Sequence, residues 1–244
     1  SFIDTLCRAD SKLGVHNTVL SLHRKPDREP IQMEGYTVQL ARENLNIAST
    51  GFSLSAFKKF KHLSSEADII HYHFPNPFMD LLHLFIQPQK PSVVTYHSDI
   101  IRQSTLLHLY RPIQKRFLGL ADSIVATSPN YLFTSKTLNE FKEKVAVIPI
   151  GVEHDRYNSP SPECLDHWQN RLTKPFFLFI GEMRYYKGLE IALDAIRGTK
   201  LKLIIVGAGE LEQKLKSKAC ALRLNNVVFL GSVSDEDKIA LLHL

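Results

Sequence analysis

The sequence predicts an α/β fold of two Rossmann-like domains, each a doubly wound parallel sheet, which face one another across a cleft. Apolar runs of strand length alternate with helical patterns along the whole chain, as is typical of parallel sheets covered by helices on both faces. The alternation is interrupted once by a stretch marked by Gly151, Pro160 and Pro162. This break predicts two domains, residues 1–152 and residues 153–244.

The first domain is expected to begin with a helix at residues 2–13, which ends at Gly14 because glycine readily takes the left-handed conformation that closes helices. Short apolar runs then predict strands at residues 18–22, 36–40, 67–73, 92–97, 123–127 and 145–150. Apolar residues at helical spacing predict helices at residues 54–63, 78–85, 105–120 and 131–140. Residues 24–35 are polar with two prolines and are expected to form a loop.

In the second domain the same patterns predict strands at residues 176–180, 201–206 and 227–230. Helices are expected at residues 189–196, 210–222 and from residue 235 onward. Residues 151–174 are expected to form a linker and one helix. Its prolines make it a natural domain boundary.

Composition excludes several classes of protein. The chain is 44% hydrophobic and 23% charged, which is typical of globular proteins and excludes disordered and coiled-coil chains. The net charge of +5 suits contact with phosphates or an anionic surface, but no run of Lys and Arg resembles a nucleic-acid-binding arm. Three scattered cysteines, Cys7, Cys164 and Cys220, indicate a reducing, cytoplasmic compartment. The first residues have neither a Met nor the features of a signal peptide, so we expect that the natural protein begins further upstream.

Candidate functional residues follow the predicted strands, because ligands of open α/β sheets bind beyond the carboxyl ends of the strands. In the first domain these are His71, His73, His97, Ser128 and Asn130. His71 and His73 share one face of a strand and, with His97, could form a zinc site. We favour the alternative that one histidine is packed and the others line the cleft, since no nearby carboxylate or cysteine completes a zinc-binding pattern.

In the second domain Arg184 and Lys187 lie between a strand end and a helix start. A helix N-terminus attracts anions, so these two cations predict a diphosphate site. Gly207-Ala208-Gly209 resembles the start of a dinucleotide-binding fingerprint, but Glu212 occupies the place of its third small residue. A turn whose backbone approaches a ligand is therefore favoured over an NAD site.

Residues 57–61 (FKKFK) combine aromatic and basic side chains on a predicted helix. Such a mixture could contact an anionic membrane surface, although a solvated helix face is the interpretation we favour.

Several segments together resemble the family 4 glycosyltransferases of the GT-B fold. They occur in the family's order along nearly the whole chain: VTYHSDI (94–100), LADSIVATSP (120–129), VIPIGV (147–152), FIG (179–181) with YYKGL (185–189), VGAG (206–209) and VFLG (228–231). The segment HYHFPNP (71–77) resembles the bacterial mannosyltransferase-like subset.

The resemblance implies a retaining, metal-independent transfer of a sugar, with mannose suggested, from a nucleotide diphosphate donor. The implied acceptor is a glycan or a lipid-linked molecule. The implied process is bacterial surface polysaccharide synthesis, such as that of lipopolysaccharide. No cofactor or nucleic acid is implied, and the place of action is the cytoplasm, with peripheral contact to the inner membrane. The first domain would bind the acceptor with His71, His73, Ser128 and Asn130, and the second domain the donor. His97 falls on the cleft histidine that contacts the transferred sugar. Lys187 falls on the phosphate-binding lysine, and Gly181, Gly207 and Val233 on positions near the nucleotide.

The sequence departs from the family pattern in three places. Glu182 stands where the family has an arginine. Arg184 follows two residues later, and in an extended chain it would point to the same side as residue 182. We therefore expect Arg184 to take over the phosphate contact. The family's glycine-rich first loop and its acidic donor motif are absent, so both domains are expected to be incomplete, the first lacking its first strand and the second its C-terminal part. We therefore expect the 244 residues alone to be marginally stable and inactive.

Two alternatives stay open. The first is a nucleotide-sugar epimerase or phosphorylase built on the same fold. The second is a non-catalytic remnant or binding subunit, because Glu182 and the absent motifs weaken the donor site.

Overall fold

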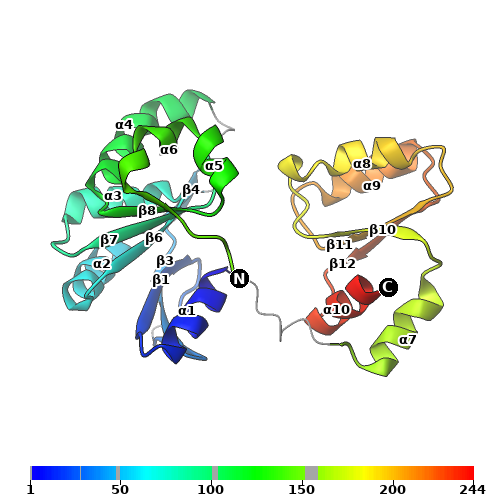
Figure 1. Ribbon diagram of the computed structural model, residues 1–244, viewed down its shortest axis with the longest axis horizontal. Coiled ribbons are helices and arrows are strands. Elements are labelled where there is room, and N and C mark those ends of the chain that lie inside the picture. Colours follow the sequence, from blue (N-terminus) through cyan, green and yellow to red (C-terminus); the bar gives the residue numbers. More distant parts are fainter. Residues whose placement is uncertain (1, 28, 48–49, 101–103, 152–158) are drawn as a thin grey trace. The chain divides into compact units, whose positions relative to one another are not determined.

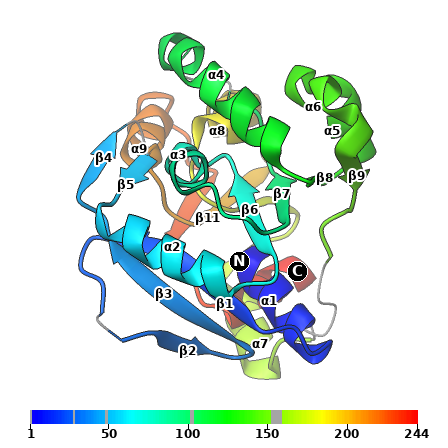
Figure 2. The same cartoon turned by 90° about the vertical axis from the view of Figure 1, so that its left-hand side faces the viewer.

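The computed structural model describes residues 2–27, 29–47, 50–100, 104–151 and 159–244 (Figures 1 and 2). The chain divides into two compact units, Ser1–Val152 and Glu153–Leu244. One buried apolar cluster fills the first unit, and two clusters on opposite faces of a sheet fill the second.

The larger sheet of the first unit is parallel, in the order β6-β7-β8-β9. Its strands are Ile70–Phe74 (β6), Ser92–Tyr96 (β7), Ser123–Ala126 (β8) and Val145–Val147 (β9). Phe74 pairs with Tyr96, Tyr96 with Ala126 and Ala126 with Val147, so all four strands end at one edge. The strands are shorter than predicted: residues 67–69 and 148–150 lie outside them, and Ile69 is 58% exposed.

A second sheet in this unit has the order β1-β3-β2, with strands Asn17–His23 (β1), Ile31–Met33 (β2) and Tyr36–Arg42 (β3). β1 and β3 are parallel, whereas β2 forms an antiparallel hairpin with β3. The predicted loop over residues 24–35 is therefore found at residues 24–27 and 29–30, but the prediction was wrong for residues 31–33, which form β2. A two-residue turn ending at Gly35, whose φ is +84°, connects the hairpin, and this short-turn signal could have revealed it. The small hairpin of Leu45–Ile47 (β4) and Thr50–Phe52 (β5) was also missed.

Helices cover the sheets of the first unit as their apolar spacing predicts. They are Phe2–Lys12 (α1), Ser55–Glu66 (α2), Pro77–Ile86 (α3), Ser104–Leu120 (α4), Pro129–Thr134 (α5) and Lys136–Glu140 (α6), with a short 3₁₀ turn at Lys142–Lys144 (η1). α2 buries Ala56, Phe60 and Ser64, each one helical turn apart. The single helix predicted over residues 131–140 is two helices. Ser135 is extended and its hydroxyl accepts the N–H of Leu138, so it caps α6.

The second unit holds one parallel sheet, in the order β10-β11-β12. The strands of this sheet are Phe176–Ile180 (β10), Lys202–Val206 (β11) and Val227–Gly231 (β12). The helices of the second unit are Pro162–Arg171 (α7), Leu189–Ile196 (α8), Glu212–Ala221 (α9) and Asp235–His243 (α10). A 3₁₀ turn lies at Tyr185–Lys187 (η3). Figure 1 shows α8 and α9 on one face of the sheet and α7 and α10 on the other.

The strand β11 alternates its side chains between these two faces. Leu203 and Ile205 pack toward α8 and α9, and Ile204 and Val206 toward α7 and α10. Residues 152–158 of the predicted linker lie outside the described residues. None of the described helices is both long and apolar enough to cross a membrane.

Candidate functional site

Three histidines lie together at the carboxyl edge of the larger sheet in the first unit. His71 and His73 lie on β6, and His97 follows the last residue of β7. His73 pairs with Thr95 in the strand register, so the side chains at 71, 73, 95 and 97 share one face. We call His71, His73 and His97 the histidine ladder.

The rings of the ladder stack in sequence. The centroids of His71 and His73 are 4.7 Å apart, and those of His73 and His97 are 5.4 Å apart. Nδ1 of His73 is 3.1 Å from Nε2 of His97, and Nε2 of His71 is 2.7 Å from Oγ1 of Thr95. Phe2 of α1 completes the cluster with an edge contact to His97 at 5.0 Å. The ladder is therefore fixed by Thr95 at one end and by Phe2 at the other.

The environment keeps these imidazoles neutral. Burial, and to a smaller extent the neighbouring His71 and His97, lower the pKa of His73 to about 4. Burial also lowers the pKa of His71 and of His97. At neutral pH the ladder therefore presents hydrogen-bonding groups, which suit the hydroxyl groups of a sugar. Within the described ranges, no group of three or more His, Cys, Asp or Glu is arranged to hold a metal ion.

Ser128 and Asn130 lie just beyond β8 on the same sheet. The Ser128 hydroxyl accepts a hydrogen bond from the N–H of Tyr131 at 3.2 Å and so caps α5. The predicted contact of Ser128 with the acceptor substrate stays a prediction. Asn130 is exposed in the first turn of the same helix.

Asp99, two residues after His97, braces the loop that carries the ladder. Its Oδ1 accepts the hydroxyl of Tyr96 at 2.8 Å and the hydroxyl of Ser135 at 2.9 Å. The sequence patterns assigned no role to Asp99 or to Phe2. Ser135, the second partner of Asp99, and His97, the partner of Phe2, lie far away in the sequence, so no local pattern marks these two contacts.

Arg184 and Lys187 lie between β10 and α8, at the carboxyl edge of the second unit's sheet. Lys187 is the last residue of η3, and Gly188, with φ +71°, turns the chain directly into α8. The Lys187 ammonium lies 5.3 Å from the centroid of the Tyr186 ring. A cation beside a helix N-terminus is the geometry that the sequence predicted for a phosphate site.

The Arg184 guanidinium is paired with two carboxylates. It lies 2.8 Å from Glu182 and 3.6 Å from Glu210, and the hydrogen bond to Glu182 is the main cause that raises its pKa. Arg184 and Glu182 thus lie side by side, but the chain between them is not extended as predicted. The N–H of Arg184 donates to the carbonyl oxygen of Glu182 at 2.9 Å, which closes a turn at Met183. A phosphate that approaches Arg184 must compete with both carboxylates.

Gly207 and Gly209 let two loops of this edge touch. A Cβ atom on Gly207, whose φ is +122°, would lie 2.1 Å from the carbonyl oxygen of Gly181, and one on Gly209 would lie 2.6 Å from the nitrogen of Met183. The N–H of Met183 donates to the carbonyl of Ala208 at 2.9 Å. The prediction was that these glycines admit a ligand, and the contact that they make in the structure is with the neighbouring loop.

Val233 lies after β12 and packs against the cluster formed with α7 and α10. The next residue, Ser234, begins α10 through a capping box with Asp237, whose carboxylate also accepts the indole N–H of Trp168 at 2.9 Å. The polypeptide at Val233 is therefore held firmly at the same edge as Gly181 and Gly207.

Two family models together cover most of the chain. Glycosyltransferase Family 4 matches residues 1–156, and Glycosyl transferases group 1 matches residues 164–244. The chain is 53% identical to the D-rhamnosyltransferase WbpZ of Pseudomonas aeruginosa, over 98% of this chain and 63% of that protein. It is 47% identical to the O-antigen chain mannosyltransferase C of Escherichia coli, over 90% of this chain and 59% of that protein. The chain thus spans about three fifths of the length of these relatives.

Solved structures give the same picture of the fold. A sucrose-phosphate synthase from Thermosynechococcus elongatus superposes with a TM-score of 0.76 at 18% identity, over 98% of this chain and 66% of that one. Anabaena HepE in complex with UDP-glucose has a TM-score of 0.62 at 22% identity, over 84% and 57%. These likenesses confirm the predicted α/β fold with parallel sheets, and the predicted cleft between two domains stays a prediction.

Proposed function

The chain belongs to the family 4 glycosyltransferases and is homologous to O-antigen rhamnosyl- and mannosyltransferases of surface polysaccharide synthesis. From this premise we propose that the protein transfers a sugar with the D-manno configuration from a nucleotide diphosphate to a glycan or lipid-linked acceptor, with retention of configuration. D-Rhamnose is 6-deoxy-D-mannose, so the sugars named for the two relatives differ only at C6. The proposed place is the cytoplasm, a reducing compartment that suits the three free cysteines.

The observation that carries this proposal is the position of Arg184 and Lys187 at the entry to α8. A departing nucleoside diphosphate gains negative charge as the glycosidic bond breaks. Two cations and the N-terminus of α8 offset this charge without a metal ion. Gly181, Gly207 and Val233 lie in the backbone segments at the same edge, where we propose that the nucleotide binds.

The histidine ladder is the proposed sugar side of the reaction. His97 is the proposed catalytic residue, as a neutral hydrogen-bonding partner of the transferred sugar. We propose that His71, His73, Ser128 and Asn130 belong to the acceptor side. All five residues lie on β6 or just beyond β7 and β8, which end at one edge of their sheet.

The test is a transfer assay with GDP- and UDP-linked mannose, D-rhamnose and glucose, with a lipid-linked glycan extract as the acceptor. The expected product is a new α-glycosidic bond made from a manno-configured donor, formed equally well with a chelator present. An epimerised nucleotide sugar or a sugar 1-phosphate would instead identify an epimerase or a phosphorylase. Binding of nucleotide without any product would identify a non-catalytic subunit. That the 244 residues alone are inactive stays a prediction.

A further inference from the structure

The chain that follows β7 passes from one face of the sheet to the other. His97 lies on the face of the histidine ladder, whereas its neighbour Tyr96 lies on the opposite face and is fully buried. The N–H of His97 still donates to the carbonyl oxygen of Phe74 at 2.9 Å, and the next residue, Ser98, is exposed. Since β7 ends at Tyr96, the residues after His97 depend on side-chain contacts for their position.

Asp99 supplies these contacts on the buried face. Its Oδ1 accepts hydrogen bonds from the hydroxyl groups of Tyr96, at 2.8 Å, and of Ser135, at 2.9 Å. Both donors are buried, and the Tyr96 hydroxyl also lies 3.5 Å from Nε2 of Gln114, a buried residue of α4. We call Asp99, Tyr96 and Ser135 the aspartate anchor. The anchor holds the loop of His97 from the side that faces away from the histidine ladder.

The aspartate anchor also reaches the helices on the proposed acceptor side. Ser135 caps α6, and α5, which carries Asn130 and Tyr131, lies directly before it in the chain. Burial, and next the negative charge of Asp99, raise the pKa of Tyr131, so the carboxylate acts on α5 as well. One carboxylate therefore connects the loop of His97 to the α5–α6 segment.

We propose that Asp99 is a positioning residue for His97 in the transfer reaction. This inference rests on the proposed function, in which His97 contacts the transferred sugar and α5 belongs to the acceptor side. Asp99 fixes the two sides relative to each other through buried hydroxyl groups, without touching either substrate. Such positioning matters because a misplacement of about 1 Å costs about a hundredfold in the rate of an enzyme reaction.

The test is a double-mutant cycle that measures kcat of sugar transfer. Asp99→Ala is expected to lower kcat about tenfold or more, while calorimetry shows the same affinity for a nucleoside diphosphate as in the wild type. His97→Ala/Asp99→Ala should be no slower than His97→Ala alone, because a positioning residue acts only through the residue that it places. Asp99→Asn should restore much of the loss, since its amide oxygen can still accept both hydroxyl groups.

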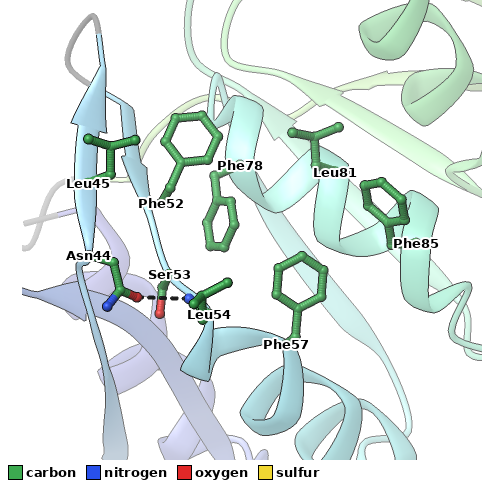
Figure 3. Close-up of a pocket in the computed structure, with 9 residues that line it drawn as sticks. All are labelled: Asn44, Leu45, Phe52, Ser53, Leu54, Phe57, Phe78, Leu81 and Phe85. Atoms are coloured by element: carbon green, nitrogen blue, oxygen red, sulfur yellow. Dashed lines mark hydrogen bonds between the residues drawn. The ribbon is translucent and has the colours of Figure 1, made fainter.

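A pair of serine variants separates positioning from stability. Ser135→Ala removes a helix cap together with a hydrogen bond to Asp99. Ser53→Ala also removes a buried hydroxyl, which accepts the N–H of Ala56 in α2 at 3.1 Å and lies 3.1 Å from the hydroxyl of Ser55. Figure 3 shows Ser53 in an apolar groove between the β4–β5 hairpin, α2 and α3, which four phenylalanines line. Ser135→Ala should lower kcat about threefold or more, and Ser53→Ala should leave it unchanged.

A pair of tyrosine variants makes the same comparison within the sheet. Tyr96→Phe removes the second hydroxyl that donates to Asp99 and should lower kcat about threefold or more. Tyr72→Phe removes a buried hydroxyl on the same face of the sheet, whose partner is Nδ1 of His83 at 2.8 Å. This control should leave kcat unchanged.

Three outcomes would overturn the inference. These are an unchanged kcat in Asp99→Ala, a double variant clearly slower than His97→Ala alone, and equal losses in the anchor and control variants. Thermal unfolding checks that each variant folds, and Tyr96→Phe takes the place of Asp99→Ala in the cycle if the latter does not. A wild type that transfers no sugar would contradict the proposed function as well, whereas an active wild type with an additive cycle contradicts this inference alone.

Discussion

Nδ1 of His73 and Nε2 of His97 lie 3.1 Å apart, so that one imidazole donates a hydrogen bond to the other. The two rings are also stacked, with an angle of 19° between their planes. Rotation of the His97 ring would break both contacts. We therefore infer that His73 acts as a positioning residue for His97.

His97→Ala is expected to lower kcat about a hundredfold, because it removes a positioned hydrogen-bonding group at the sugar. Affinity for a nucleoside diphosphate, measured by calorimetry, should hardly change. His73→Ala should lower kcat less, about tenfold, without a change in the donor KM. His73→Asn should restore much of the loss, because its side-chain amide can take the place of Nδ1. A fall in nucleotide affinity that matches the fall in kcat would contradict these roles.

Lys187→Ala is expected to weaken binding of a nucleoside diphosphate at least about tenfold, since a charge-assisted contact contributes about 1.5–3 kcal/mol. Isothermal titration calorimetry measures the change. Lys200→Ala, which removes another exposed lysine from the same unit, is the control. Equal affinity of the wild type and Lys187→Ala would remove Lys187 from the donor site.

Glu182→Gln is expected to strengthen nucleotide binding up to about fivefold. The Glu182 carboxylate lies 2.8 Å from the Arg184 guanidinium, and an exposed ion pair of this kind contributes up to about 1 kcal/mol. Neutralising Glu182 removes one competitor of the donor phosphate. The gain should disappear in Arg184→Ala/Glu182→Gln. A weaker affinity for Glu182→Gln would show instead that Glu182 itself contacts the ligand.

Gly207→Ala is expected to lower the free energy of unfolding of the second unit by more than about 3 kcal/mol. The new Cβ would clash with the Gly181 carbonyl and add the strain of a positive φ. Gly198→Ala has a positive φ but open space around the Cβ position, and should cost only about 1–2 kcal/mol. Chemical denaturation followed by Trp168 fluorescence measures both. Similar costs for the two variants would show that the loop contact is unimportant.

Asp80→Asn is expected to gain stability over the wild type as the pH rises. Burial raises the pKa of Asp80 from 3.8 to about 7, and the hydrogen bond from Tyr110 opposes this rise. Because the folded pKa lies above the unfolded one, Asp80 contributes its stability fully below pH 4, and this contribution is lost as the pH rises to about 7. Asparagine cannot ionise and still accepts from Tyr110. Urea unfolding at pH 5 and pH 8 measures the free energy of unfolding of Asp80→Asn relative to the wild type, and this relative stability should be higher at pH 8. The control variant Glu66→Gln, at the exposed end of α2, should show no such change.

Much of the fold could be predicted from local sequence. The apolar run of residues 176–180 is β10 to the residue, and residues 189–196 are α8. Gly14, with φ +82°, lies just beyond α1. Such elements are specified by neighbouring residues, since strand and helix periodicity and glycine conformations are properties of a few consecutive positions.

Two elements were predicted wrongly, for different reasons. The β4–β5 hairpin has three-residue strands, and neither run is apolar enough to identify by itself. Ser135 interrupts the predicted helix because its hydroxyl also donates to Asp99, which is 36 residues away in the sequence. The contact between Ser135 and Asp99 is one that no local pattern contains.

The sequence by itself determined the family, the parallel α/β units and the residue types at the strand ends. The ordered motifs and the hydrophobic periodicity that indicate them are properties of the local sequence. Only the tertiary structure decided how those residues meet. It joined His73 to His97, paired Arg184 with Glu182 and Glu210, fitted Gly207 against Gly181 and assembled four phenylalanines from three elements into one groove. Strand register and helix packing bring these groups together, and both are set by burial of side chains that lie far apart in the sequence.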